Sequence, residues 1–319
     1  MHRTTPLTAA TLLGLALLAP TTSASAAGET CEGVAATIVG TPDTRVAGTP
    51  GDDVILSNGA FSVEAGEGDD LICVSAAADP RGHNTDVDAG PGDDVVVVVA
   101  ASDGSSASVW ADLGPGRDRF RGGDGEDRVS ASFDDTIVAD RASDLVTFAL
   151  APGEALPSTI GSITGNRTAG YTEVTAPGRR VRMDARDRTI SVDGQVVTTI
   201  GEVPGMLYGI AQHVTLVGTP GADRLVATAC GLSTVLGGGG DDQILRLGFD
   251  APPNDECPRS RMRASGGAGD DRITGTINAD VLRGGAGNDW LKGRRGKDVA
   301  RGGSGRDTCF SERTSDCER

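Results

Sequence analysis

Residues 266–310 consist of five nine-residue units that follow one another without a gap: GGAGDDRIT, GTINADVLR, GGAGNDWLK, GRRGKDVAR and GGSGRDTCF. The units share the pattern Gly-Gly-x-Gly-x-Asp-x-apolar-x. A chain that keeps glycine, aspartate and an apolar side chain at one fixed interval needs a fold with the same interval. Such units bury their apolar positions by stacking on their neighbours, so this region is predicted to form a solenoid.

Further copies of the unit occur at irregular spacing, at 48–56, 65–73, 89–97, 113–121, 122–130, 218–226 and 237–245. In each copy an aspartate stands two residues before an apolar side chain. Between about 131 and 217 the unit fades. The stretch RRVRMDARDRTISVDGQVVTTI alternates as strands do, and Asp193-Gly194 predicts a hairpin turn within it. This segment is either a β insertion or a set of non-binding turns of the same solenoid, and the sequence leaves both open.

The composition of the unit suits a turn that binds calcium. Glycine adopts positive φ angles without steric cost and lets backbone carbonyls approach an ion. Six residues would present carbonyl oxygens and one carboxylate, and the other three would form a short strand whose middle residue points inward. Ca²⁺ takes about six to eight oxygen ligands. One loop cannot supply them all but two stacked loops can, so we expect each unit to form half a coil.

These residues resemble the RTX, or haemolysin-type, calcium-binding repeat, whose nonapeptide consensus is the pattern given above. The resemblance implies an all-β fold, a parallel β-roll (β-solenoid) with several Ca²⁺ ions between successive turns, here with a non-repeat β insertion. The candidate metal ligands are the aspartates of the units: Asp53, Asp70, Asp94, Asp118, Asp127, Asp223, Asp242, Asp271, Asp280, Asp289, Asp298 and Asp307.

Within the contiguous array, units two apart should lie on the same edge of the roll. Asp271 would then share an ion with Asp289, and Asp289 with Asp307. On the other edge Asp280 would share an ion with Asp298. The expected inward residues are Ile273, Leu282, Leu291, Ala300 and Cys309.

A disordered glycine- and aspartate-rich tract is the alternative. Such a tract would have no reason to keep an apolar residue two places after each aspartate. Repulsion between stacked carboxylates further predicts that the array is unfolded without the ion, so that calcium binding and folding are one equilibrium.

The start of the chain has the pattern of a secretory signal peptide: Arg3, an apolar stretch at 7–20 and small residues at 24–27. We therefore expect a signal peptide at 1–27 and a secreted, extracellular protein. The expected organisation continues with an irregular calcium-binding roll at 28–130, the non-repeat segment at 131–217 and a second roll at 218–319.

The 319-residue chain carries 29 basic and 45 acidic residues, a net charge of −16. Loss of the signal removes one arginine and makes this −17. So acidic a chain is not expected to bind nucleic acid. Beyond the signal, no stretch approaches the roughly 20 apolar residues of a membrane-spanning helix, so insertion into a membrane is not expected.

Six cysteines, an even number, suggest disulfides in an exported protein. We expect the pairs that are neighbours in sequence: Cys31–Cys73, Cys230–Cys257 and Cys309–Cys317. A zinc site is the alternative, but only His83 and His213 follow the signal and no C-x-x-C motif occurs.

Neither a G-x-S-x-G nor an H-E-x-x-H motif is present. We expect a structural or adhesive calcium-binding protein, with extracellular or cell-surface polysaccharide as a candidate partner. The alternative is a secreted polysaccharide-modifying enzyme, lyase- or epimerase-like, whose site lies in the non-repeat segment or on the solenoid face. The basic residues at 179–182 could bind an anionic polymer, but such clusters are more often the solvated face of a hairpin beside acidic neighbours.

Overall fold

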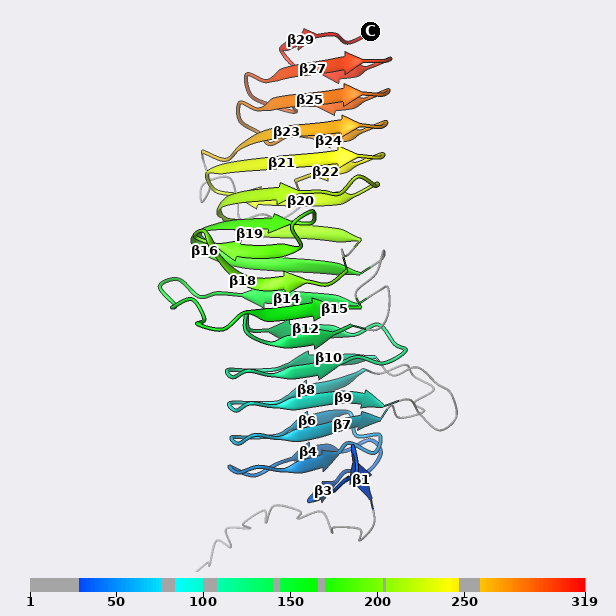
Figure 1. Cartoon of the computed structure of the whole chain (residues 1–319), viewed down its shortest axis with the longest axis vertical. Helices are drawn as coiled ribbons and strands as arrows, with labels where there is room; N and C mark the ends of the chain where they lie inside the picture. The colour runs from blue at the N-terminus through cyan, green and yellow to red at the C-terminus, as the bar shows by residue number, and fades with distance from the viewer. Residues whose placement is uncertain are drawn as a thin grey trace, which may run out of the picture.

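The computed structural model describes residues 29–75, 84–99, 108–139, 144–165, 170–202, 205–246 and 259–318. These residues form 29 strands and no helix, and therefore no helix able to span a membrane. Of the strands, 27 belong to one continuous sheet that winds into a stack of coils (Figure 1). The all-β, parallel β-roll prediction is confirmed. The expected signal peptide at 1–27 lies outside the described residues. The first strand begins at Thr30.

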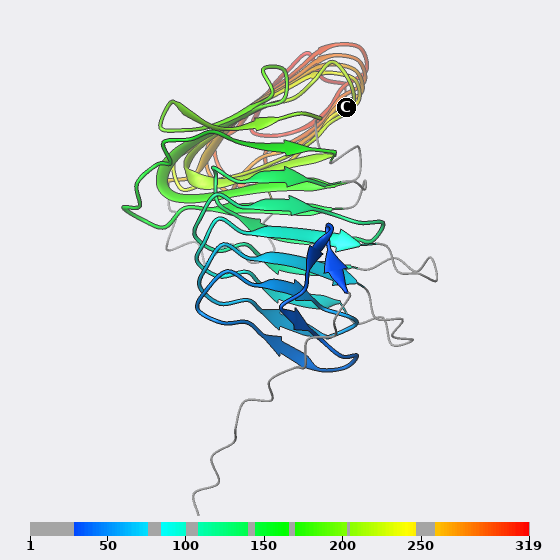
Figure 2. The same cartoon turned by 60° about the horizontal axis from the view of Figure 1, so that its bottom comes forward.

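The N-terminal coils are built from short strands of two to five residues. They are β1 (Thr30–Cys31), β2 (Val34–Ala35), β3 (Ile38–Val39), β4 (Arg45–Ala47), β5 (Val54–Leu56), β6 (Ser62–Glu64), β7 (Leu71–Ser75), β8 (Thr85–Asp88), β9 (Val95–Val99), β10 (Val109–Asp112), β11 (Arg119–Arg121), β12 (Arg128–Ala131) and β13 (Thr136–Val138). Every second strand pairs in parallel, so that β5, β7, β9, β11 and β13 form one face. Figure 2 shows the β1–β2 hairpin lying against this stack.

The middle segment continues the stack and also interrupts it. Its strands are β14 (Leu145–Ala149), β15 (Gly161–Thr164), β16 (Tyr171–Asp184), β17 (Thr189–Val192), β18 (Gln195–Ile200) and β19 (Met206–Val217). Parallel pairing runs from β12 through β14 and β16 to β19. Between these coils, β17 pairs antiparallel with β16 and β18. The segment thus contains both turns of the solenoid and an inserted hairpin.

The expected hairpin turn lies between β17 and β18. Asp193 has φ 51° and Gly194 has φ 90°. Positive φ at both central residues is the geometry of the two-residue turn that fits the twist of a hairpin.

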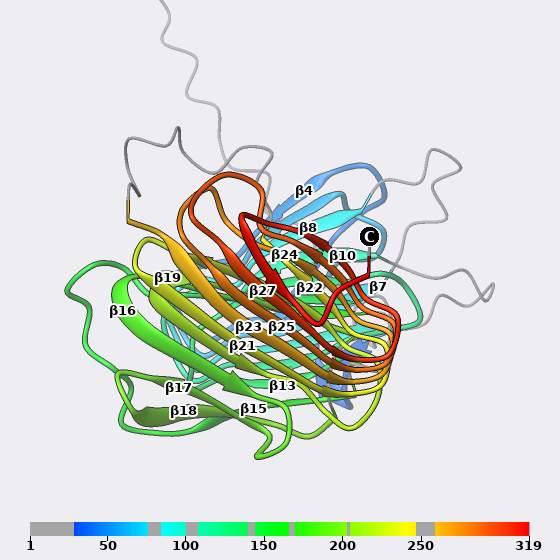
Figure 3. The same ribbon diagram turned by 90° about the horizontal axis from the view of Figure 1, so that it is seen from above.

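The C-terminal coils are the most regular. They comprise β20 (Arg224–Ala229), β21 (Leu232–Gly239), β22 (Gln243–Leu245), β23 (Arg261–Ala268), β24 (Arg272–Thr274), β25 (Val281–Ala286), β26 (Trp290–Lys292), β27 (Val299–Ser304), β28 (Thr308–Phe310) and β29 (Arg313–Ser315). Ile273 pairs with Leu291, and Leu282 with Ala300. Units two apart therefore stack, and nine residues form half a coil as predicted. Figure 3, seen along the stack, shows β21, β23, β25 and β27 overlying one another.

One apolar core runs through the stack. Ile273, Leu282, Leu291 and Ala300 are fully buried, as predicted from their place in the unit. Cys309 is only partly buried, because no complete coil follows it, and it packs against the end of the core. The inward side chains are mainly Val, Ile, Leu and Ala, and for this reason a chain with 3% aromatic residues still forms a core.

Disulfides lie at both ends of the stack. Cys31 pairs with Cys73, with a Cα–Cα distance of 5.6 Å, and ties the β1–β2 hairpin to β7. Cys309 pairs with Cys317 at 5.9 Å. These two of the three predicted pairs are confirmed. Cys230 is also disulfide-bonded, but its expected partner Cys257 lies outside the described residues.

Candidate metal centre

The aspartates of the units form ladders along the edges of the roll. In the array, the backbone amide of Asp271 donates to Oδ1 of Asp289, and that of Asp289 to Oδ1 of Asp307, both at 2.9 Å. On the other edge Asp280 donates to Asp298 in the same way, also at 2.9 Å. The three predicted pairs thus lie in consecutive coils. That each pair shares an ion stays a prediction.

The same ladder occurs in the N-terminal coils, where the spacing of the units is irregular. It links Asp53, Asp70, Asp94, Asp118 and Asp135 by amide-to-Oδ1 bonds of 2.7–2.9 Å. On the opposite edge, Asp127 donates to Asp144. Asp223 and Asp242 lead into the ladder of the array at Asp271.

Sequence reasoning missed Asp135 and Asp144. Both stand two residues before a buried apolar side chain, Ile137 and Val146, as the other ladder aspartates do. The signal was therefore present in the sequence. Neither is preceded by the glycines of the unit, and for that reason the pattern fades there.

The second carboxylate oxygen divides the candidate ligands into two classes. In eight aspartates, which we call the unpaired aspartates, Oδ2 is buried and no hydrogen-bond donor among the described residues reaches it. They are Asp70, Asp94, Asp118, Asp242, Asp271, Asp289, Asp298 and Asp307. A buried carboxylate oxygen without a partner is costly, and native structures rarely leave one. Its regular recurrence at one position of the unit fits the binding of a cation there.

We call the remaining four candidates the paired aspartates. In each of them Oδ2 accepts a hydrogen bond from the backbone amide of the second residue of the same unit. The donors are Thr49 for Asp53, Gly123 for Asp127, Thr219 for Asp223 and Thr276 for Asp280. Each threonine also donates its hydroxyl to the same carboxylate. The structure thus gives these four aspartates an internal partner in the place where the unpaired ones have none.

The conformation of the second residue of the unit separates the two classes. It has positive φ in all eight units with an unpaired aspartate: Gly66, Gly90, Gly114, Gly238, Gly267, Gly285, Arg294 and Gly303. It has no positive φ in the four units with a paired aspartate. Glycine takes this conformation freely. Arg294, with φ 80°, takes it against its own preference, and such strain is typically retained at functional sites.

The first glycine of the unit makes room for the carboxylate. A Cβ atom on Gly284 would lie 2.0 Å from Oδ2 of Asp289, and one on Gly266 would lie 1.9 Å from Oδ2 of Asp271. No side chain fits at either position unless the carboxylate moves. Glycine is thus required here by the position of the acid and not by backbone conformation.

Burial raises the pKa of several ladder carboxyls, among them Asp118, Asp242 and Asp271. The pKa of Asp271 is raised to about 6, that of Asp242 to about 7 and that of Asp118 to about 8. The main cause is loss of solvent, which disfavours the charged form, and neighbouring carboxylates add to it. Backbone hydrogen bonds lower the pKa but do not offset burial. Without a cation, these groups would hold protons at pH values where exposed aspartates are ionised.

The donor set fits calcium better than zinc. Among the described residues, no three His, Cys, Asp or Glu side chains gather around a common point. A cation at the unpaired oxygens would therefore take most of its ligands from backbone carbonyls of the glycine-rich loops. Ca²⁺ accepts carbonyl and carboxylate oxygen together, whereas structural zinc sites need cysteine or histidine.

A second ladder, on the outside of the loops, explains why the unit often holds two consecutive acidic or amide residues. In six units the residue before the ladder aspartate accepts a bond from the amide of its counterpart in the next coil. Asp270 accepts from Asn288 at 2.6 Å, and Asn288 accepts from Arg306 at 3.0 Å. These side chains are exposed. Nδ2 of Asn288 also donates to the carboxylate of Asp270, and the backbone and side-chain bonds together hold the coils in register.

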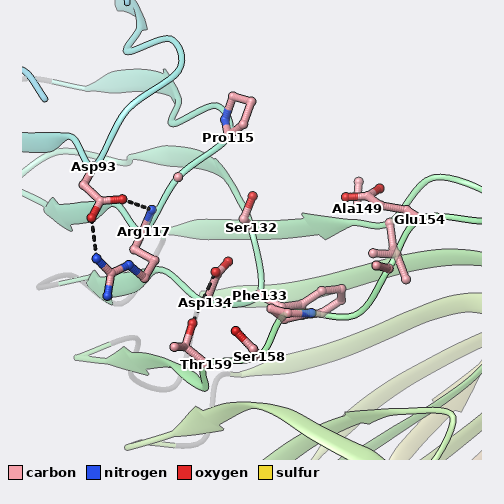
Figure 4. Close-up of a pocket in the computed structure, with 14 residues that line it drawn as sticks. Asp93, Pro115, Arg117, Ser132, Phe133, Asp134, Ala149, Glu154, Ser158 and Thr159 are labelled. Carbon is pink, nitrogen blue, oxygen red and sulfur yellow. Dashed lines mark hydrogen bonds and ion pairs between the residues drawn. The ribbon is translucent and has the colours of Figure 1, made fainter. Parts of the chain in front are cut away.

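Figure 4 shows an open pocket where the N-terminal coils meet the middle segment. Its charged groups already have partners. Asp93 accepts bonds from the backbone and the guanidinium of Arg117, Asp134 accepts one from Thr159, and Glu154 accepts one from Ala151. No histidine or cysteine lines this pocket. Its residues do not form the nucleophile–base pair or the pair of free carboxylates that hydrolytic chemistry uses.

The other candidates from the sequence have structural roles. His213 accepts a bond through Nδ1 from the amide of Leu232, and His83 lies outside the described residues. In the basic cluster, Arg179 forms an ion pair with Asp193 at 2.9 Å and Arg182 pairs with Asp184. The interpretation of this cluster as a hairpin face balanced by acids fits these contacts.

Comparison with known families bears on the repeats alone. The model of the RTX calcium-binding nonapeptide repeat (4 copies) matches residues 111–138, 263–291 and 274–309. No curated protein matches the chain. The first match extends to 138 and so includes Asp135, which the structure places in the ladder. The geometry of the ladders and this match lead to one conclusion: the chain carries RTX calcium-binding nonapeptide repeats in both halves of its β-roll.

Proposed function

We propose that this protein is a secreted structural protein whose β-roll folds when Ca²⁺ binds along its edges. The observation that carries the proposal is the set of eight buried Oδ2 atoms without a donor, repeated at one position of the unit. The unpaired aspartates would bind the ions together with loop carbonyls. The bound ions would offset the desolvation and mutual repulsion of the ladder.

A location outside the cell fits this chemistry. Disulfides persist in oxidising compartments. Extracellular calcium modules bind at about 10⁻⁴–10⁻³ M. Folding would then be switched on by export, because calcium is scarce before export and plentiful after it.

An acidic polysaccharide is the partner that the surface favours. The outward positions of β23, β25 and β27 hold Arg261, Arg263, Arg283 and Arg301, all exposed. Among the described residues none of the four guanidinium groups has an ion-pair partner. Arg283 and Arg301 occupy paired positions on neighbouring strands, where like charges repel. A polymer carrying carboxylates would relieve that repulsion through paired hydrogen bonds.

Far-UV circular dichroism during a calcium titration tests the folding proposal, with magnesium as the control. We expect a cooperative gain of β signal with calcium only. An unchanged spectrum on adding calcium or chelator would contradict it.

Binding of the calcium-loaded protein to polygalacturonate tests the proposed partner. The double variant R283S/R301S should bind less, whereas R119S, on the N-terminal coils, should bind as the wild type does. Product analysis in the same assay detects turnover.

A further inference from the structure

Two glutamates outside the repeats lie at the C-terminal ends of the aspartate ladders. The amide of Asp298 donates to Oε2 of Glu312 at 2.8 Å, and the amide of Asp307 donates to Oε2 of Glu318 at 2.5 Å. Within the array the same amide donates to the aspartate of the next coil. Glu312 and Glu318 therefore take the position of the next ladder aspartate on the two edges.

The closing segment, residues 311–318, follows a shorter path than a coil. Glu312 comes 14 residues after Asp298, and Glu318 comes 11 residues after Asp307, whereas ladder aspartates in the array are 18 apart. The extra methylene of glutamate lets its carboxylate reach the ladder from this path.

Three contacts hold the closing segment against the last coil. β29 pairs in parallel with β27, and the amide of Glu318 donates to the carbonyl of Asp307 at 2.8 Å. The disulfide between Cys309 and Cys317 lies next to Glu318 in sequence. The glutamates are thus placed by backbone pairing and a covalent link.

The aspartates facing these glutamates are both unpaired. Asp298 is 0% exposed and Asp307 is 1% exposed, and Oδ2 of each lacks a donor among the described residues. On the Asp298 edge the preceding aspartate, Asp280, has both oxygens satisfied, largely by Thr276. A cation at Asp298 therefore needs its second carboxylate from the other side, where Glu312 lies.

We propose that Glu312 and Glu318 are calcium ligands, which complete a terminal site with Asp298 on one edge and with Asp307 on the other. The inference rests on the proposed calcium function of the ladders. In each terminal site the glutamate replaces the acid that a further coil would supply, so the array ends without a ladder aspartate left alone.

Counting bound calcium tests this inference. Wild type, E312Q and E318Q are refolded with calcium and their disulfides intact, and then titrated by calorimetry with metal analysis after dialysis. Each variant should lose one ion, or bind it about tenfold or more weakly, and the double variant should lose two. D316N is the matched control, because Asp316 is exposed in the same segment and its side chain makes no hydrogen bond to a ladder among the described residues.

The outcomes separate this inference from the proposed function. If the wild type binds no calcium, both the proposed function and the terminal sites are contradicted. A wild type that binds calcium, with the same count and affinities in E312Q and E318Q, overturns the terminal sites alone. Circular dichroism checks the fold of each variant. If E318Q does not fold, E318D replaces it: a carboxylate one methylene shorter should also lose the ion, and an unchanged count in E318D overturns the site at Asp307.

Discussion

The amide of Asp289 donates a 2.9 Å hydrogen bond to Oδ1 of Asp307, and Oδ2 of Asp307 remains buried without a donor. One oxygen therefore joins two coils through the backbone while the other is free to take a cation. At every unpaired aspartate, Oδ1 accepts the amide of the preceding coil and Oδ2 has no donor among the described residues. Coil stacking and ion binding thus depend on the two oxygens of one side chain.

Replacing Asp289 with asparagine tests the ion-binding role alone. D289N can keep the coil-joining bond through its amide oxygen but loses the carboxylate charge. We expect calcium affinity of the C-terminal array to fall about tenfold or more and the calcium midpoint in circular dichroism to rise. D270N is the control, because Asp270 is exposed and Asn288 already holds the same position one coil later. Equal effects of the two variants would contradict the assignment.

Replacing Gly284 with alanine tests the packing of the carboxylate. The new Cβ would lie 2.0 Å from Oδ2 of Asp289 and would displace it. Overpacking of this kind costs about 1–3 kcal/mol, and we expect that loss in urea unfolding with calcium present, together with weaker calcium binding. G51A is the control, since nothing lies within 4 Å of a Cβ at Gly51 and its φ is not positive. A G284A protein as stable as G51A would refute the packing argument.

Replacing Arg294 with glycine should stabilise the protein, unlike the two substitutions above. The φ of 80° at Arg294 is the conformation that the other units with an unpaired aspartate assign to glycine. R294G should raise the calcium-bound stability by about 1 kcal/mol, because it relieves a strain of that order. R295G, whose position has no positive φ, should give no such gain. Thermal unfolding of both variants in calcium decides the matter, and a destabilised R294G would show that the arginine side chain contributes more than its strain costs.

The regular part of the roll was predictable because two periodicities coincide there. An apolar residue every nine positions places Ile273 and Leu291 in the core, and an aspartate two places earlier places Asp271 and Asp289 on one edge. Each coil repeats the same environment, so the spacing in sequence becomes spacing in space. Where extra residues lengthen a coil, as between Asp70 and Asp94, the ladder persists but its partners are not evident from spacing.

The division into paired and unpaired aspartates was harder to foresee. Thr49, Thr219 and Thr276 are visible in the sequence as the second residue of their units, but their bond to aspartate depends on a loop conformation that only the structure shows. Glu312 and Glu318 match no repeat, because backbone pairing and a disulfide place them at irregular spacing.

The stability of the roll should depend on pH in opposite ways with and without calcium. In the metal-free chain, burial raises the pKa of Asp94 and Asp271 to about 6 and of Asp118 to about 8. A folded-state pKa above the unfolded value means that the folded state binds more protons between about pH 4 and 8. Metal-free stability should therefore be greatest near pH 4 and fall as the pH rises to 8.

With calcium bound, protons compete with the ion for the same oxygens, so stability should fall as the pH drops below about 6. The far-UV β signal in chelator at pH 5 and pH 8, and urea unfolding in calcium at the same two pH values, measure both trends. High salt screens the exposed charges but not the buried carboxyls, so the metal-free trend should survive in it. The same sign of pH dependence in chelator and in calcium would contradict the ladder as the site of binding.

The disulfide between Cys309 and Cys317 should protect the end of the array. Removing it in C309S/C317S frees the closing segment, and a short disulfide loop is worth about 2–3 kcal/mol. Because each coil contacts only its neighbours, the loss should be local. Hydrogen exchange in calcium should show faster exchange in β27 and β29 and little change in β21 and β23.

The matched variant C31S/C73S should speed exchange in β5 and β7 and leave the C-terminal coils unchanged. Uniform loss of protection along the whole roll in C309S/C317S would mean instead that the stack unfolds as one unit, with no separate role for its end.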